Sequence, residues 1–398
     1  MDLTLLLIEL FLLIIFTYSI ALALMSLLFG RTDSEKIALF VEKFAIIIPS
    51  YKEGGVLLHN VESIKKQNYP SDKYEIFIIN DRCELSVIEK LRSTGVKIID
   101  VEFNRSSKVK SLHAAEKYIG DEFDSVIVLD ADNLIHPNFL DEINLSLVNG
   151  NKIVQGKRIA KNLETNFSRL DSLTDTFYNF LDRYSPNRLK LSATISGSGF
   201  AVKKDLFFSV LKEINVFGGF DKAMQMILIC SGYRIKFSPN ALVYDEKVST
   251  SAEFIKQRRR WLFAHAKMIF KHSISIMRSL LTDFNLDKLN LLFIQLRPPL
   301  TTIILFTLSF ILYNFISGFY IMALLWLSVL ISYGFFLILT MILDKSNIKI
   351  YFTLFTTPIL FANHFLSLFG IYKASGDSLH TSHSSLRKIE EILSVEKR

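Results

Sequence analysis

The sequence contains few cysteines, and they form no pattern that could organise a fold. Only Cys83 and Cys230 occur among 398 residues, without the spacing of a metal site. A disulfide scaffold is therefore excluded, and a reducing compartment is expected for the globular part. The chain also lacks internal repeats and low-complexity tracts, which excludes a repeat architecture.

A strong excess of charge of one sign is missing as well. Lys and Arg total 46 against 39 Asp and Glu, a formal net charge of +7, but they are spread along the chain. Because no nucleic-acid-binding motif occurs, we expect no nucleic acid partner. Phosphate-bearing substrates and anionic membrane lipid headgroups are the expected partners.

Hydrophobic residues are abundant and unevenly placed. They make up 50% of the chain, and the mean hydropathy is +0.31. This is too apolar for an ordinary soluble domain and too polar for a bundle of membrane helices alone. We therefore expect one soluble domain joined to membrane helices.

The first apolar run spans residues 3–29 and contains one charge, Glu9. It exceeds the core of a signal peptide, and neither a basic leading region nor a clear cleavage site accompanies it. An uncleaved membrane helix is predicted. Arg31, Lys36 and Lys43 follow it, so the positive-inside rule places residue 31 onward in the cytoplasm.

An alternating α/β pattern follows, up to about residue 245. Apolar runs predict buried parallel strands at Phe44–Pro49, Ile76–Ile79, Val96–Val101 and Val126–Leu129. Amphipathic segments predict helices at 56–67, 110–119 and 137–148. The alternation predicts an open, doubly wound sheet, in which ligands bind beyond the carboxyl ends of the strands.

Acidic residues stand at those strand ends. Asp130 and Asp132 follow the fourth run directly, where two carboxylates can bind Mg²⁺ or Mn²⁺, or one can bind a sugar hydroxyl. Asp81 after the second run and Glu53 after the first can accept from a base or a ribose. The alternatives are a solvated turn with a helix cap, an Asn-Asp turn and an exposed loop.

Three further positions have polar side chains or glycines suited to a ligand. Lys108 opens a helix and either meets a diphosphate or is an exposed loop lysine. The segment Ser196-Gly-Ser-Gly199 either lets backbone approach a ligand or is an ordinary turn. Asp221 begins a helix, as a general base or as a cap.

Segment 250–282 is basic and amphipathic, which predicts a helix at a membrane surface, or one buried in the globular domain. Within it, Gln257, Arg260 and Trp261 share one helix face. The guanidinium suits a phosphate and the indole suits a sugar ring. The alternative is a basic cluster that binds lipid headgroups, which is the interpretation of Arg258 and Arg259.

Apolar runs near 299–316, 319–343 and 350–371 are each long enough to span a bilayer. Arg297-Pro-Pro299 opens the first and predicts an interfacial elbow. Four spans would place the tail from residue 373 outside, whereas its basic residues favour the cytoplasm, so either the tail is outside or one late segment is re-entrant or interfacial.

Taken in order, these pieces resemble the membrane-bound family-2 glycosyltransferases, inverting GT-A enzymes of the cellulose, chitin and hyaluronan synthase type. The matching segments are Ile47–Glu53, Asn80–Cys83, Lys108–His113, Asp130–Asp132, Ser196–Gly199, Gly218–Asp221 with Gly232–Ile235, and Gln257–Trp261. The chain departs from the family at Asn80, Phe220 and His113, where the family has an acid, a glutamate and an asparagine.

The resemblance implies a GT-A, Rossmann-like α/β domain with a mostly parallel sheet and transmembrane helices at both ends. It implies donor binding by Glu53, Asp81, Lys108, Asp130, Gln257 and Arg260, acceptor binding by Trp261, Ser198 and Gly199, metal binding by Asp132 and Asp130, and Asp221 as the base. The expected domains are a membrane helix (1–30), the catalytic domain (31–249), the amphipathic segment (250–297), membrane helices (298–372) and a polar tail (373–398).

By this resemblance, the expected reaction transfers a sugar from a nucleotide donor, expected to be UDP-linked, to a polysaccharide hydroxyl at the plasma membrane, with Mg²⁺ or Mn²⁺. Single-sugar transfer to a lipid is the alternative within the enzyme class. A non-catalytic membrane scaffold or transport component is the alternative outside it. A homo-oligomer or partner subunit could complete a polymer channel.

Overall fold

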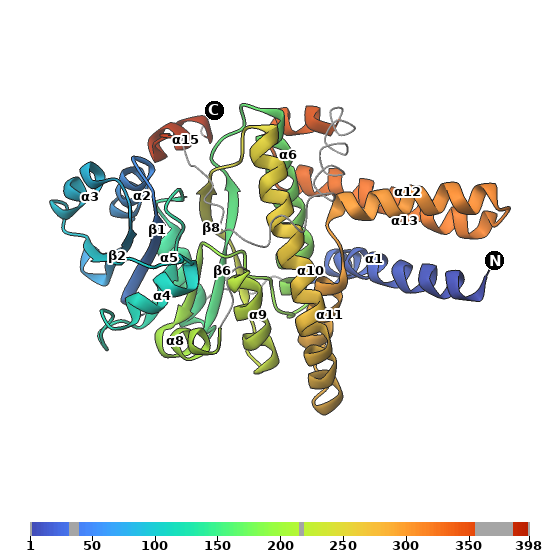
Figure 1. Cartoon of the computed structure of the whole chain (residues 1–398), viewed down its shortest axis with the longest axis horizontal. Coiled ribbons are helices and arrows are strands. Elements are labelled where there is room, and N and C mark those ends of the chain that lie inside the picture. The colour runs from blue at the N-terminus through green and yellow to red at the C-terminus, as the bar shows by residue number, and fades with distance from the viewer. Residues whose placement is uncertain (1, 32–39, 215–218, 355–384, 397–398) are drawn as a thin grey trace. The chain divides into compact units, whose positions relative to one another are not determined.

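The computed structural model describes residues 2–31, 40–214, 219–354 and 385–396. They divide into two compact units, which we call the helical unit and the sheet unit. The helical unit comprises 1–32, 165–191 and 249–372, and the sheet unit comprises 33–164, 192–248 and 373–398. Residues 165–191, which we expected within the catalytic domain, thus cluster with the apolar helices. Figure 1 labels the elements of both units.

One eight-stranded sheet organises the sheet unit, in the order β3-β2-β1-β4-β7-β6-β8-β5. The strands are β1 (Phe44–Tyr51), β2 (Tyr74–Asp81), β3 (Lys97–Asp100), β4 (Ser125–Val128), β5 (Leu134–Ile135), β6 (Ile153–Ala160), β7 (Phe200–Lys203) and β8 (Lys236–Asp245). Strands β3, β2, β1 and β4 are mutually parallel, and so are β6 and β8. The pairs β4–β7, β6–β7 and β5–β8 are antiparallel.

The α/β class is confirmed, but the sheet is mixed and not parallel throughout. The parallel half is the part with unbroken apolar strands, because helices cover both of its faces. Phe44, Ile46 and Ile48 of β1 pack into the core beneath α2 (Val56–Lys65), α3 (Leu85–Arg92) and α5 (Phe139–Val148). On the other side, α4 (Lys108–Glu116) contacts β1 and β2, and α8 (Lys204–Glu213) contacts β4 and β7.

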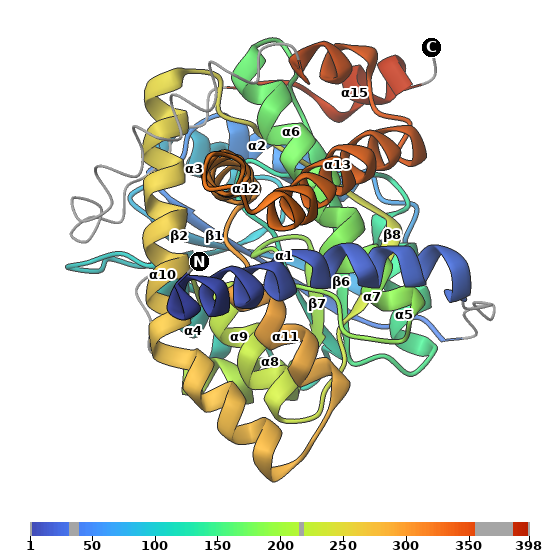
Figure 2. The same cartoon turned by 90° about the vertical axis from the view of Figure 1, so that its right-hand side faces the viewer.

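A bundle of apolar helices forms the core of the helical unit. Its elements are α1 (Leu3–Phe29), α6 (Asn166–Asn179), the π-helical turn η2 (Phe180–Tyr184), α7 (Ser185–Arg188), α10 (Ser251–Thr282), α11 (Leu286–Leu296), α12 (Leu300–Ile316) and α13 (Tyr320–Leu343). Helices α12 and α13 lie side by side (Figure 2). Phe16 of α1 and Trp326 of α13 meet edge to face in the core, with ring centroids 5.9 Å apart.

By length and composition, α1 and α13 could each cross a membrane among the described residues. A third crossing is possible if α11 and α12, which are bent by 70° at their break, count as one span. The bend falls at the predicted elbow, because Pro298 and Pro299 cannot continue the helix. Of the run expected at 350–371, only residues 350–354 are described, and they are helical.

Two buried polar clusters connect the elements of the helical unit. Asn314 and the Trp326 indole N–H donate to the Glu9 carboxylate, at 2.8 and 2.7 Å. At the elbow, the buried Arg297 guanidinium donates to both Asp182 carboxylate oxygens, at 2.8 and 2.6 Å. Each cluster ties segments more than a hundred residues apart, so both specify how this bundle is assembled.

Candidate functional site

The acids predicted at the strand ends lie along one edge of the sheet. Strands β1, β2 and β4 are parallel, and in their registers Tyr51 pairs with Asp81 and Ile47 with Val128. Glu53, Asp81 and Asp130 therefore follow three neighbouring strands at the same carboxyl edge. This is the edge where ligands bind in sheets of this kind.

Asp81 is the most unusual of these acids. Its side chain is fully buried, and neither carboxylate oxygen accepts a hydrogen bond from the described residues. The nearest cationic group is Arg82 Nε, 4.0 Å from Oδ1. A buried acceptor without a donor costs about 1–3 kcal/mol, more when it is charged. Such a carboxylate suits a ligand that brings its own N–H or O–H donors.

The loops after β1 and β2 hold Asp81 and Glu53 in place. Lys52 N–H donates to the Asp81 carbonyl, and Glu84 N–H donates to the Glu53 carbonyl, both at 3.0 Å. Lys52 and Arg82 adopt left-handed backbone with φ of 53° and 60°. Backbone of this kind is strained for residues other than glycine and clusters at functional sites.

Asn80 explains one departure from the family pattern. Its side-chain oxygen accepts from Cys83 N–H at 3.0 Å, and its amide donates to Asp100 at 2.7 Å. Asn80 therefore builds the turn and does not act as a second acid. Burial raises the pKa of the Cys83 thiol to about 11, consistent with our interpretation of Cys83 as structural.

Lys108 joins the two halves of the candidate site. As the first residue of α4, it pairs with the Asp130 carboxylate. Its ammonium also donates to the Gly197 carbonyl at 2.8 Å. The half-exposed Asp130 and the glycine loop before β7 are thus held together by one cation. A cation placed there can also meet a diphosphate.

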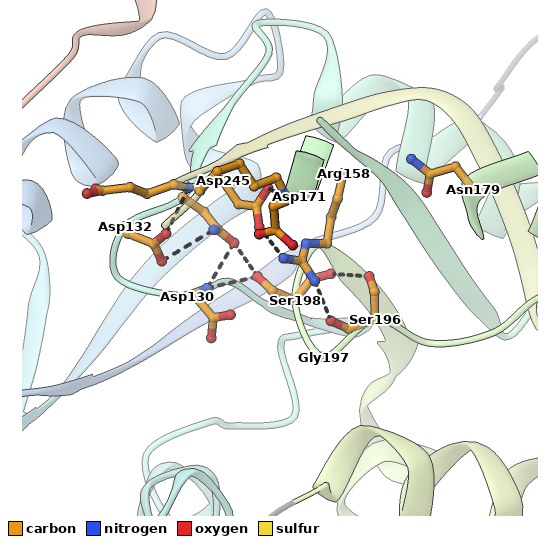
Figure 3. Close-up of polar contacts among 12 residues, drawn as sticks. Asp130, Asp132, Arg158, Asp171, Asn179, Ser196, Gly197, Ser198 and Asp245 are labelled. Carbon is orange, nitrogen blue, oxygen red and sulfur yellow. Dashed lines mark hydrogen bonds and ion pairs between the residues drawn. The ribbon is translucent and has the colours of Figure 1, made fainter. Parts of the chain in front are cut away.

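The loop Ser196–Gly199 lies beside the Asp-Ala-Asp turn and contacts it through Ser198 (Figure 3). The fully buried Ser198 hydroxyl accepts from Asp130 N–H at 2.9 Å and contacts Asn133 Oδ1. A Cβ atom at Gly199 would lie 2.6 Å from a Val243 methyl group, so only glycine fits. These contacts give Ser198 and Gly199 a positioning part. Contact of either residue with an acceptor stays a prediction.

Asp221 lies against the same loop. A Cβ atom at Gly197 would be 3.5 Å from Asp221 Oδ2. Asp221 is in the first turn of α9 (Phe220–Cys230), whose N-cap is Gly219 with a φ of 72° and no side-chain capping bond. Asp221 is therefore not the cap, and its carboxylate adjoins the loop that Lys108 contacts. This position suits a base near the donor site.

Asp132 is buried, whereas Asp130 is half exposed. Its Oδ2 accepts from Glu246 N–H at 3.1 Å, and its carbonyl accepts from the buried Lys161 ammonium at 3.2 Å. No group of three His, Cys, Asp or Glu that could hold a metal ion occurs among the described residues. Mg²⁺ commonly takes only one or two protein carboxylates beside substrate phosphates. The carboxylate oxygens of Asp130 and Asp132 are suitable ligands for an ion of this kind.

Sequence analysis did not identify the polar residues at the ends of β6 and β8. Arg158 pairs with Asp245 and donates to the Ser196 carbonyl at 3.0 Å (Figure 3). The buried Lys247 lies 2.8 Å from the Asp245 carboxylate. Neither β6 nor β8 has the continuous apolar run that predicted the other strands. The sequence pattern therefore did not predict these two strands or their pairing.

Gln257, Arg260 and Trp261 lie on α10, in the helical unit, where the expected helix spans Ser251–Thr282. Their approach to a donor held by the sheet unit stays a prediction. Arg258 is not available to lipid headgroups, because it is paired with buried Asp171 at 2.7 Å. The Arg258 guanidinium also covers the Trp261 ring at 4.8 Å, which positions the indole.

Comparison with known proteins identifies relatives for the part of the chain that carries these residues. The family model described as glycosyltransferase like family 2 matches residues 42–264, more than half of the 398 residues. The probable glycosyltransferase YdaM of Bacillus subtilis (strain 168) is 24% identical over 246 residues, which are 58% of this chain and 56% of YdaM.

Poly(ribitol-phosphate) beta-N-acetylglucosaminyltransferase TarS of Staphylococcus aureus is 28% identical over 105 residues, 25% of this chain and 18% of TarS. The chain thus spans about half, or less, of the length of these curated relatives. Among solved structures, the mannosyltransferase PcManGT from Pyrobaculum calidifontis in complex with GDP-Man and Mn²⁺ aligns with a TM-score of 0.49 and 18% identity, covering 82% of this chain and 98% of that one. TarS 1–349 in complex with UDP-GlcNAc aligns with a TM-score of 0.35 and 17% identity, covering 56% and 66%.

Proposed function

Because the chain belongs to glycosyltransferase like family 2, we propose that it is an inverting glycosyltransferase that uses a nucleotide-sugar donor. The donor is UDP-linked in this proposal, with Mg²⁺ or Mn²⁺ as the cofactor. The observation that carries the proposal is the fully buried Asp81 carboxylate, which accepts no hydrogen bond from the described residues. A uracil N–H or a ribose hydroxyl supplies the missing donor.

Each acid has one part in the proposed reaction. Asp81 and Glu53 bind the nucleoside, and Lys108 neutralises diphosphate charge. Asp221 removes the proton from the acceptor hydroxyl, whose oxygen then attacks the anomeric carbon from the face opposite the leaving diphosphate. One displacement with one base inverts the configuration and requires no covalent nucleophile. Asp130 and Asp132 would hold the divalent ion, which stabilises the diphosphate as it leaves.

Gln257, Arg260 and Trp261 complete the proposed site from α10. Arg260 adds a second positive group to the leaving diphosphate, and Gln257 an amide. Trp261 offers the acceptor sugar a flat ring. The support within the helical unit is the stacking of Arg258 on Trp261, which holds the indole in one orientation.

The acceptor in the proposal is a polysaccharide hydroxyl at the plasma membrane. Transfer of a single sugar to a lipid is the second candidate. It is favoured by the two or three helices long enough to cross a membrane among the described residues, which are few for a polymer channel in one chain. A homo-oligomer or partner subunit would supply the missing helices. Product length with radiolabelled donor separates the two, because one sugar per acceptor would eliminate polymer synthesis.

A membrane location is supported by the far half of α10. Phe270, Ile274, Met277 and Leu281 fall at helical spacing and are exposed, Phe270 by 84% and Leu281 by 88%. Lys271 and Arg278 lie between them. This pattern is typical of a helix lying in the interface of an anionic bilayer.

The described tail supports a cytoplasmic placement of residues 385–396. They belong to the sheet unit and pack against its strands, so they lie on the same side of the membrane as the acids. The chain between 249 and 384 then crosses an even number of times. Helix α13 and the bent pair of α11 and α12 would account for two crossings.

A nucleotide-sugar screen with the protein in detergent tests the function. Release of nucleoside diphosphate should require one donor, an acceptor and Mg²⁺ or Mn²⁺, and should stop when the metal is chelated. No release with any donor would leave the non-catalytic scaffold as the better description. Release without added metal would contradict the assignment of Asp130 and Asp132.

A further inference from the structure

Residues 385–396 form a short segment, which we call the strap, that lies along the sheet unit. The Ser385 N–H donates to both Glu246 carboxylate oxygens, at 3.0 and 3.1 Å. Arg387 donates to the Lys161 carbonyl at 3.1 Å and pairs with Glu164. The strap therefore contacts the chain just beyond the ends of β8 and β6.

An apolar contact anchors the helix of the strap, α15 (Ile389–Glu396). Its Ile389 and Ile392 are buried in one cluster with Leu134 and Tyr244. Leu134 and Tyr244 are partners in the β5–β8 register. Leu134 is two residues after Asp132, so the strap covers the strand pair that directly follows the Asp-Ala-Asp turn.

Two of the residues that accept hydrogen bonds from the strap, Glu246 and Lys161, also contact Asp132. Glu246 N–H donates to Asp132 Oδ2 at 3.1 Å. The Lys161 ammonium donates to the Asp132 carbonyl at 3.2 Å and lies 3.4 Å from Glu246. These two strap contacts are thus one residue removed from the buried acid, and the strap acts on Asp132 through Glu246 and Lys161.

The strap also touches the loop that carries Glu53. A Cβ atom at Gly55 would lie 3.2 Å from a Leu386 methyl carbon. Farther along, Glu390 pairs with Lys66, which follows α2. The strap therefore bridges the Glu53 loop and the Asp132 turn, two parts of the sheet edge that are about 80 residues apart in the sequence.

We propose that the strap positions the donor site, with Arg387 and the Ser385 N–H as positioning groups that hold the Asp132 turn. The inference rests on the proposed function, because Asp132 is taken as one of the two acids that hold the metal ion at the donor site. Asn60 of α2 already joins that helix to the Asp-Ala-Asp turn, because its amide donates to the Asp130 and Asn133 carbonyls at 2.9 and 2.7 Å. The strap adds a second connection, through residues far downstream in the sequence.

Kinetics of two variant pairs test the proposal in the full-length protein. Ser385→Pro removes the N–H that donates to the Glu246 carboxylate, whereas Ser385→Ala keeps that N–H. Arg387→Ala removes both guanidinium contacts, whereas Glu391→Ala changes an exposed residue elsewhere in the strap. We expect Ser385→Pro and Arg387→Ala to raise the donor KM about tenfold with kcat within about threefold of the unchanged protein. Both control variants should keep the unchanged KM.

Hydrogen exchange supplies a readout that does not depend on turnover. The Glu246 N–H donates a hydrogen bond to Asp132 Oδ2. Its hydrogen should exchange with solvent faster in Ser385→Pro and Arg387→Ala than in the control variants. Unchanged exchange and an unchanged KM in both variants would overturn the proposal. A fall in thermal midpoint and kcat with constant KM would also overturn it, because the strap would then only stabilise the fold. If the unchanged protein transfers no sugar, the proposed function fails, and the exchange result still decides whether the strap holds Asp132.

Discussion

Replacing Asp81 by asparagine should produce two effects of opposite sign. The carboxylate is fully buried and accepts no hydrogen bond from the described residues, so it destabilises the protein when no ligand is bound. Asparagine has nearly the same shape and no charge. We expect Asp81→Asn to raise the thermal midpoint of the ligand-free protein, by the equivalent of about 1 kcal/mol or more.

The same substitution should weaken donor binding. One hydrogen bond to a charged group contributes about 1.5–3 kcal/mol, and each 1.4 kcal/mol is about tenfold in affinity. Losing one such bond from Asp81 therefore predicts a Kd for UDP, or for the diphosphate identified by the screen, that rises about 10- to 150-fold. Calorimetry with the protein in detergent measures this directly.

Asp100→Asn is the matched control. Asp100 ends the neighbouring parallel strand β3, but its carboxylate is half exposed and already paired with Arg92 at 2.5 Å. Its replacement should leave diphosphate binding unchanged and should not raise the thermal midpoint. Unaltered binding by Asp81→Asn, or a lower midpoint of its ligand-free form, would refute the assignment of Asp81 to the nucleoside.

Three further predictions concern the base, the tryptophan helix and the buried thiol. Asp221→Asn should lower transfer by about 10²–10⁴-fold while diphosphate binding is kept, and full transfer by this variant would exclude Asp221 as the base. Arg258→Ala leaves Asp171 buried without its cation, so the thermal midpoint should fall by the equivalent of about 3–5 kcal/mol, and Arg258→Lys should restore only part of it. The folded-state pKa of Cys83 is raised to about 11, above its usual value, so the neutral thiol contributes stability at neutral pH that is lost as pH rises towards 11. Iodoacetamide at pH 8 should therefore modify the partly exposed Cys230 first, as peptide mass spectrometry can show, and faster labelling of Cys83 would contradict its burial.

The parallel half of the sheet could be predicted because its signals are local. Each strand from β1 to β4 is a short apolar run, since helices cover both faces of that part of the sheet. Acids placed directly after such runs must reach the carboxyl edge, whatever the rest of the chain does. The helix that carries Gln257 and Trp261 was likewise visible from its spacing.

The second half of the sheet depends on partners that are distant in the sequence. Strand β7 lies between β4 and β6 and is antiparallel to both, after a helical excursion through 165–191 that joins the other unit. The polar residues of β6 and β8 are stabilised by pairs such as Arg158 with Asp245, 87 residues apart. No local sequence pattern predicts such a pair, because each residue considered alone would be predicted to be an exposed charge.

The sequence by itself determined which residue types stand at the sheet edge and which segments are apolar enough for a membrane. Only the tertiary structure decided which contacts those residues make. Ser198 and Asn80 stabilise turns, Arg258 stacks on Trp261, and Ser385 donates to Glu246, which in turn contacts Asp132. The physical reason is that periodicity and propensity act within a few residues. Buried hydrogen bonds and ion pairs stabilise the protein only through partners that are distant in the sequence and that folding brings together.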